Sequence, residues 1–216
     1  MDQQPDSDNS LVISYLWLRT AIGIIGIALP FALALGKILF DGGGLQSSMS
    51  AYYYTNTRNV FVGSLCAIGI FLMSYRGYGR KDNIAGKLAC VFAIGVAFFP
   101  TTPPTIAAPG DKLIGVIHLT CAALLFLTLA YFSLCLFRKT DPTKPPTPQK
   151  QRRNLVYALC GYAILASILL IATFKALPSL APFQEFKPVF WLEALAVVSF
   201  GVSWLTKGEA ILADEK

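Results

Sequence analysis

The stretch LIGVIHLTCAALLFLTLAYFSLCLF, Leu113–Phe137, contains no aspartate, glutamate, lysine or arginine and a single histidine, His118. Lys112 precedes it, and Arg138 and Lys139 follow it. A helix needs about 20 mostly apolar residues to cross the hydrocarbon core of a bilayer, and this stretch is longer than that. Lipid also requires every backbone hydrogen bond to be made within the segment. The stretch therefore predicts a transmembrane helix.

Five more apolar runs lie on either side of this one along the chain. The six predicted spans are about 20–40, 59–75, 84–99, 113–137, 155–174 and 189–205. Composition agrees with them, because 55% of the 216 residues are hydrophobic and 14% are charged, against about 25% charged in soluble domains. We predict an all-α fold, a polytopic transmembrane helical bundle of six spans that forms a single domain over residues 1–216.

The distribution of lysine and arginine predicts the orientation of these spans. Thirteen of the 18 basic residues fall on the side that holds both ends of the chain, and cytoplasmic loops carry such an excess. The other five are Lys37, Arg58, Lys112, Lys175 and Lys187. We expect both the N-terminus and the C-terminus to be cytoplasmic, together with a proline-rich basic linker, 138–154, that is extended and mobile.

Two other classes of function are not expected. The basic residues flank apolar spans, so their charge serves topology and no nucleic-acid partner is predicted. All five cysteines lie within apolar runs and lack the C-x-x-C spacing of zinc or redox sites. We therefore predict no metal and no cofactor. The expected partner of the protein is membrane lipid.

A polar loop precedes the second span on the side predicted to be extracytoplasmic. It runs from Asp41 to Asn59 and reads DGGGLQSSMSAYYYTNTRN. Ser50, Tyr54 and Arg58 recur in it every four residues, a spacing that places them on one helical face if the helix begins early. These three side chains are the first candidates for a ligand-binding site.

Two ionisable residues lie deeper, His118 in the fourth span and Glu193 in the sixth. Both spans run inward from the outer face, which places these side chains about 6 to 8 Å below the outer boundary at 1.5 Å per residue. Ionisable residues within spans usually face a cavity or a partner, and Arg58 or Lys187 is the expected ionic partner of Glu193. Asp111 follows Pro-Gly at the head of the fourth span, where helix capping is its expected role. The predicted outer-leaflet pocket comprises Ser50, Tyr54, Arg58, Asp111, His118 and Glu193.

Over almost its full length the chain resembles a family of uncharacterised bacterial six-span membrane proteins. The segments that carry the resemblance are LRTAIGIIGIALPFALALG from Leu18, SAYYYTNTRNVFVG from Ser50, LACVFAIGVAFFPTTP from Leu88, and FGVSWLTKGE from Phe200. Relatives often have histidine in place of Tyr54 and aspartate in place of Asn59. The resemblance implies a multi-pass protein of the bacterial inner membrane and brings no established activity.

A more distant similarity is to the superfamily of alkaline ceramidases and adiponectin receptors. These polytopic zinc-dependent hydrolases have a serine–x3–histidine motif, and Ser50 to Tyr54 has this spacing without the histidine. Their zinc needs three histidines, whereas this chain has one. The similarity implies a hydrolase in which His118, Glu193 and Asp111 would supply the ligands.

Three functions remain open at the level of the sequence. The first is a non-enzymatic protein that binds or moves a small molecule or lipid at the outer-leaflet pocket. The second is an intramembrane hydrolase that uses His118 with Glu193 or Asp111. The third is a structural or assembly protein whose buried charges fix helix packing. The sequence predicts neither the ligand nor the oligomeric state.

Overall fold

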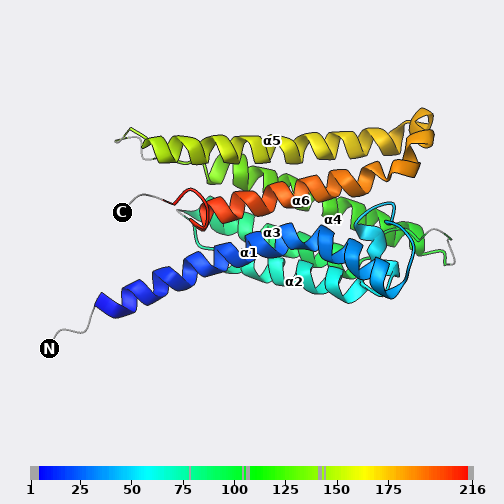
Figure 1. Cartoon of the computed structure of the whole chain (residues 1–216), viewed down its shortest axis with the longest axis horizontal. Helices are drawn as coiled ribbons and strands as arrows, with labels where there is room; N and C mark the ends of the chain where they lie inside the picture. The colour runs from blue at the N-terminus through cyan, green and yellow to red at the C-terminus, as the bar shows by residue number, and fades with distance from the viewer. Residues whose placement is uncertain are drawn as a thin grey trace.

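The structure is a computed structural model that describes residues 5–77, 79–103, 105, 108–140, 143 and 145–213. Regular structure in these residues is helical, with no strand among them. The long helices are α1 (Pro5–Phe40), α2 (Arg58–Ser74), α3 (Arg80–Phe98), α4 (Asp111–Tyr131), α5 (Pro148–Ala176) and α6 (Pro188–Lys207) (Figure 1). The short elements are the 3-10 helices η1 (Ser50–Tyr54) and η3 (Pro178–Phe186), and the π-helical turn η2 (Phe132–Leu136) that continues α4. The predicted all-α class is confirmed.

Each predicted apolar run falls on one long helix, but the helices differ in how well they suit a bilayer. Four segments are long and apolar enough to cross a membrane, namely Tyr15–Phe40, Asp111–Leu136, Pro148–Ala176 and Pro188–Lys207. α2 is apolar but has only 17 residues. α3 contains Arg80, Lys81, Asp82 and Lys87. The four strongly apolar helices indicate a membrane protein.

The predicted linker 138–154 is shorter in the structure, because α5 begins at Pro148. The Thr147 side chain accepts a hydrogen bond from the backbone N–H of Lys150 at 3.1 Å, which caps the helix. Proline suits the first helical position, where its missing N–H leaves no hydrogen bond unmade. The expectation of an extended chain is therefore wrong for residues 148–154. Of the remaining linker, residues 141, 142 and 144 lie outside the described residues.

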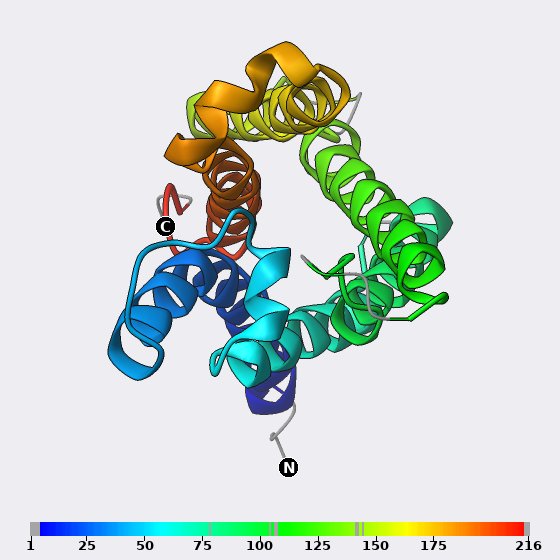
Figure 2. The ribbon, with the colours of Figure 1, turned by 90° about the vertical axis from the view of Figure 1, so that its right-hand side faces the viewer.

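The six long helices form a closed ring in the order of the sequence. Each packs against the next, and α1 packs against α6 to complete the ring. Figure 2 shows this ring along its axis, with η1 lying across its near opening. We call this opening the η1 end. The opposite end, where α6 finishes and the α2–α3 and α4–α5 connections lie, is called the Trp204 end.

Small residues allow the first and last helices to approach closely. A Cβ atom added to Gly201 of α6 would lie 2.7 Å from the backbone oxygen of Gly23 on α1, and one added to Gly23 would lie 2.8 Å from the Gly201 oxygen. A Cβ atom added to Gly86 of α3 would lie 2.4 Å from the backbone oxygen of Leu72 on α2. Small residues at interfaces are characteristic of helix packing in membranes. They close the ring at two of its seams.

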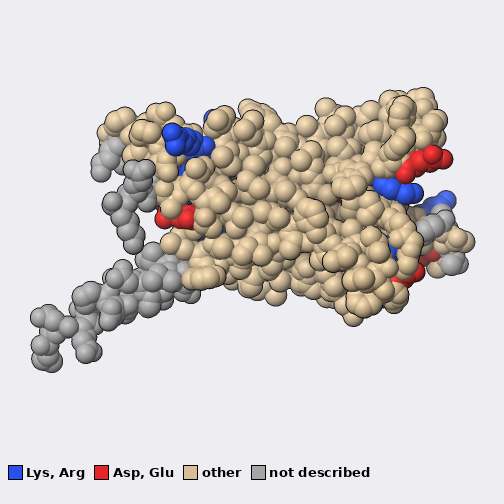
Figure 3. Space-filling view, viewed as in Figure 1, with Lys and Arg blue, Asp and Glu red and all other residues tan. Residues whose placement is uncertain are grey.

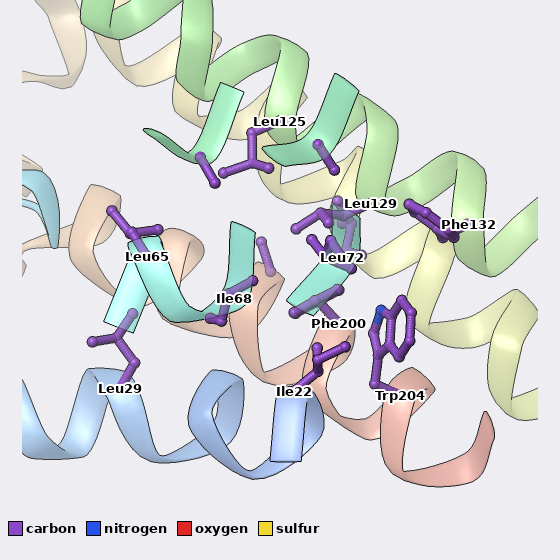
Figure 4. Close-up of a cluster of buried hydrophobic side chains, with 14 of the residues drawn as sticks. Ile22, Leu29, Leu65, Ile68, Leu72, Leu125, Leu129, Phe132, Phe200 and Trp204 are labelled. Atoms are coloured by element: carbon purple, nitrogen blue, oxygen red, sulfur yellow. The ribbon is translucent and has the colours of Figure 1, made fainter. Parts of the chain in front are cut away.

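The interior of the ring is filled by apolar side chains from most of the helices (Figure 4). Leu29, Leu65 and Leu125 belong to its aliphatic part, and all three are buried. Toward the Trp204 end the filling becomes aromatic. Trp204 lies 5.0 Å from Tyr75, 5.1 Å from Phe137, 5.7 Å from Phe132 and 6.0 Å from Phe200, measured between ring centroids. The two ends of the ring interior therefore differ in composition.

Charged side chains are concentrated at the two ends of the molecule. On the face shown in Figure 3, the wide stretch between them is built from uncharged residues. Exposed large apolar residues on this part of the helices include Phe31 at 65%, Val91 at 63% and Leu159 at 62% of their surface. A belt of this kind suits hydrocarbon, because only apolar side chains face lipid without cost.

Candidate functional site

The loop after α1 turns back and places η1 over the ring. Gly42 and Gly43 have positive φ angles of 69° and 76°, a conformation that glycine adopts without a steric penalty. The reversal buries Tyr52 completely, and its ring lies 5.9 Å from that of Phe190 on α6. Ser50, at the start of η1, is also buried. Ser50 and Tyr52 of η1 are therefore part of the interior of the protein.

His118 of α4 joins η1 to the end of α3. Its Nδ1 lies 2.6 Å from the backbone oxygen of Phe99, and its Nε2 lies 2.9 Å from Ser50 Oγ. A carbonyl oxygen can only accept, so Nδ1 carries the proton. In the neutral imidazole Nε2 is then an acceptor and the Ser50 hydroxyl donates to it. The ring is only 3% exposed, and both of its nitrogens are occupied.

Glu193 of α6 binds the residue next to Ser50. Its Oε2 accepts a hydrogen bond from the backbone N–H of Met49 at 2.6 Å. The two ionisable side chains predicted from the spans, His118 and Glu193, therefore hold two consecutive residues of one loop.

Two cavities meet at Glu193. The first lies inside the ring and has a volume of about 50 Å³. It is bordered by Ser50 and Glu193 among apolar side chains such as Leu65 and Leu125. The second has about 290 Å³ and lies between α4, α5 and α6. Its lining residues are Leu119, Ala122, Ala123, Phe126, Ile168, Ile171, Ala172, Lys175 and Glu193. Because Leu119 is 48% exposed, this second cavity opens on the side of the bundle.

The other three predicted residues surround this site and, like His118, line neither cavity. The Tyr54 hydroxyl donates to the backbone oxygen of Thr101 at 2.5 Å. Asp111 lies in the first turn of α4, where its Oδ2 accepts from the backbone N–H of Ala108 at 3.0 Å. Burial, and then the nearby carboxylate of Asp111, raises the pKa of the Tyr54 phenol above its ordinary value of 10.0. Tyr54 and Asp111 therefore belong to the rim of the η1 end.

Arg58 is placed differently from the prediction. The chain is extended at Thr55, with φ −123° and ψ 170°, so Ser50, Tyr54 and Arg58 do not share one helical face. Arg58 is exposed, and its guanidinium lies 4.0 Å above the centre of the Tyr53 ring and donates to the Tyr53 hydroxyl. Among the described residues it forms no ion pair with Glu193.

Lys175 of α5 is the basic residue that the sequence reasoning missed. It lines the lateral cavity together with Glu193. Lys187, which was also predicted as an ionic partner of Glu193, adopts a left-handed backbone conformation just before α6. In the sequence Lys175 follows an apolar run, so it contributed only to the count of basic residues that predicts the orientation of the spans. The backbone N–H of Met49 and the backbone oxygen of Phe99, which bind Glu193 and His118, were also missed, because no side-chain pattern predicts them.

The candidate metal ligands do not converge. Among the described residues, no group of three histidine, cysteine, aspartate or glutamate side chains is placed to hold a metal ion. His118 uses its two nitrogens for Phe99 and Ser50, and Asp111 is engaged with Ala108. A catalytic zinc needs three protein ligands and an open position, so the proposed set of His118, Glu193 and Asp111 does not fit one.

Comparisons with known proteins gave no match to a family model, to a curated protein or to a solved structure. The resemblance to bacterial six-span proteins therefore stays a prediction.

Proposed function

We propose that this protein crosses the cell membrane, in a bacterium the inner membrane, six times with both ends in the cytoplasm. Four helices are apolar enough on their own. α2 and α3 take their places in the same closed ring, between α1 and α4, so they run through the same layer. Arg80, Lys81 and Lys87 are exposed in the first half of α3, which begins at the Trp204 end, where their long side chains can reach headgroups. Asp82 is buried and paired with Lys139.

Reporter fusions test this topology. The excess of basic residues predicts that a reporter placed after Thr147 reports cytoplasm and one placed after Pro103 reports the outside. A cytoplasmic report from Pro103 would reverse the orientation, and equal reports from both sites would contradict the six spans.

We further propose that the protein binds or moves a small amphiphilic molecule or lipid in the pocket at the η1 end. The observation that carries this proposal is that Glu193 borders both the interior cavity and the lateral cavity. A ligand entering from the membrane between α4, α5 and α6 would place its chain along Leu119 and Ile168, and its polar group beside Lys175 and Glu193. Pockets of this composition, apolar with a few polar groups, are typical ligand sites.

Photocrosslinking with a diazirine-bearing palmitic acid in native membranes tests this site. We expect labelled peptides from α4, α5 and α6. Ala172→Trp, which fills the lateral cavity, should remove most of the label. Val91→Trp, at an exposed position on α3, is the matched control and should leave the label unchanged. Equal labelling of both variants would exclude the lateral cavity as the binding site.

A specific observation supports hydrolysis as a second candidate function. The hydrogen bond between Ser50 and His118, with Nδ1 held by Phe99, has the nucleophile, base and orienting group of a serine hydrolase. In such a reaction Ser50 Oγ would attack an ester carbonyl as its proton passes to Nε2. The alcohol would then leave with that proton, and water would release the acyl group. Labelling by a fluorophosphonate that is lost in Ser50→Ala would support this reaction, and its absence would leave the binding function.

The third candidate, a structural role, makes an opposite prediction for the same variants. If Ser50, His118 and Glu193 serve only to fix η1, their substitution lowers stability, and neither probe labels the wild-type protein at these residues.

A further inference from the structure

A groove of about 510 Å³ runs between α3 and α4, and we call it the α3–α4 groove. The residues that line it recur at helical spacing, so they form one face of each helix. On α3 they include Lys81, Ile84 and Leu88, and on α4 they include Leu124, Leu127 and Tyr131. All six of these side chains are exposed. The groove therefore opens on the outer face of the bundle and is separate from both cavities at the η1 end.

The α3–α4 groove is polar at one end and apolar along the rest of its length. Lys81 lies in the first turn of α3, and Tyr131 is the last residue of α4. Both helix ends lie at the Trp204 end of the ring. Further along the groove, the Thr128 hydroxyl donates to the backbone oxygen of Leu124 at 2.7 Å, so it is engaged within its own helix. The groove therefore has the polarity of an amphiphile, with its polar group at the Trp204 end.

The charge at the polar end is positive. Among the described residues that line the α3–α4 groove, Lys81 carries the one charged side chain. The next residue, Asp82, is fully buried and bound to Lys139 at 2.6 Å, so its carboxylate belongs to the interior of the protein. An anionic group complements this end of the groove.

The length of the α3–α4 groove favours a lipid chain over a helix as its occupant. Phe92 is the lining residue of α3 furthest from Lys81 along the chain, and the two lie about 16 Å apart along the helix axis at 1.5 Å per residue. The hydrocarbon core of a bilayer is about 30 Å thick, so the groove covers about one leaflet. A transmembrane helix of a partner or of a second copy would need a surface of the full thickness.

We propose that the α3–α4 groove binds an anionic phospholipid, with the phosphate at Lys81 and one acyl chain along Leu88 and Leu127. The lysine ammonium is a point charge with three donors, and tyrosine favours the headgroup level where Tyr131 ends α4. In the proposed topology this end faces the cytoplasm, where anionic lipids attract basic residues. The inference rests on that topology, because α3 and α4 must cross the bilayer, and it is independent of ligand binding at the η1 end.

Native mass spectrometry of the full chain in detergent, titrated with phosphatidylglycerol, tests this proposal. We expect the first bound phosphatidylglycerol to be retained at lower lipid concentration than the first bound phosphatidylcholine, which is zwitterionic. Inorganic phosphate should not displace it, because phosphate lacks the chain that fills the groove. Equal retention of the two lipids, or displacement by inorganic phosphate, would overturn the assignment to an anionic lipid.

Two lysines of α3 provide a matched pair of variants for the headgroup. Lys81 lines the α3–α4 groove, whereas Lys87 is exposed on the same helix and does not line it. Lys81→Gln should weaken the retention of phosphatidylglycerol about tenfold, the usual consequence of losing a charged hydrogen bond. Lys87→Gln makes the same change of charge and should weaken retention less than about twofold. Equal losses would show a diffuse attraction to the basic surface and overturn the site.

A second pair of variants tests the place of the acyl chain. Leu88→Trp fills the α3–α4 groove and should remove most of the retained phosphatidylglycerol. Val91→Trp is the control, because Val91 is exposed on α3 without lining the groove. Ala172→Trp, in the lateral cavity, should also leave retention unchanged, which separates this site from the one at the η1 end. Loss of the lipid in Ala172→Trp with full retention in Leu88→Trp would overturn the inference.

Discussion

The two ends of the ring bury polar groups in different ways. At the η1 end the buried polar side chains are few, and Ser50, His118 and Glu193 are hydrogen-bonded beside open cavities. At the Trp204 end several cations are packed on aromatic rings that fill the interior. The comparison teaches that the two ends differ in what surrounds their polar groups. At the η1 end Glu193 borders two cavities, whereas at the Trp204 end the cations lie against aromatic rings.

Trp204→Ala should lower the stability of the protein more than any other variant proposed here. It tests whether the aromatic interior of the Trp204 end is tightly packed. Trp204 is fully buried, and truncation of a buried tryptophan costs about 3–5 kcal/mol. The loss would appear as a lower melting temperature in detergent. Trp191→Ala is the control, since Trp191 is 57% exposed and should lose far less. Similar losses in the two variants would contradict a packed aromatic interior.

Gly201→Leu tests the close packing of α6 against α1. The new side chain would meet the Gly23 backbone, and overpacking typically costs about 1–3 kcal/mol. We expect a lower melting temperature and easier proteolysis of α1. Gly63→Leu is the matched control, because nothing lies within 4 Å of a Cβ atom at Gly63. A seam that tolerated Gly201→Leu as well as Gly63→Leu would not be held by close packing.

A double-mutant cycle sharpens the description of the η1 end. Ser50→Ala and His118→Ala remove the same hydrogen bond, so together they should cost less than their sum, with a coupling of about 0.5–1.5 kcal/mol. Arg58→Gln combined with Glu193→Gln should be additive, because Arg58 lies on Tyr53. Chemical or thermal unfolding measures both cycles. Coupling between Arg58 and Glu193 would restore the ion pair predicted from the sequence.

The smallest effect concerns the rim of the η1 end. The raised pKa of Tyr54 means that the folded protein holds the phenolic proton more tightly than the unfolded chain does. Its contribution to stability is therefore complete below pH 10 and is lost as the pH rises through the higher folded value. Tyr54→Phe should show a slightly shallower loss of stability above pH 10 than the wild type. Identical alkaline melting curves would show that Asp111 and burial do not act on this phenol.

The sequence predicted the helices, which depend on long apolar runs. It did not predict the contacts that single backbone groups make. The six helices follow from apolar length, and His118 and Glu193 stood out because their spans contain no other histidine, acidic or basic side chain. The burial of Asp82 was not foreseen, because an acid within Arg-Lys-Asp resembles a solvated loop charge. Pro148 was interpreted as part of an extended linker although proline also begins helices. The hydrogen bond to Met49 depends on the chain reversal after α1, and the one to Phe99 depends on the end of α3 meeting α4. No side-chain pattern specifies either backbone group.

Contact between α1 and α6 also sets the order of events during biosynthesis. The surface of α1 that receives Gly201 is made before its partner α6, which follows α2 to α5 along the chain. Until then Gly23 and Gly26 present a bare backbone strip to lipid or to an insertion factor, because contacts distant in sequence form only when both segments exist. A nascent chain arrested before residue 188 should therefore be degraded quickly, whereas one arrested after residue 207 should be long-lived in pulse-chase experiments.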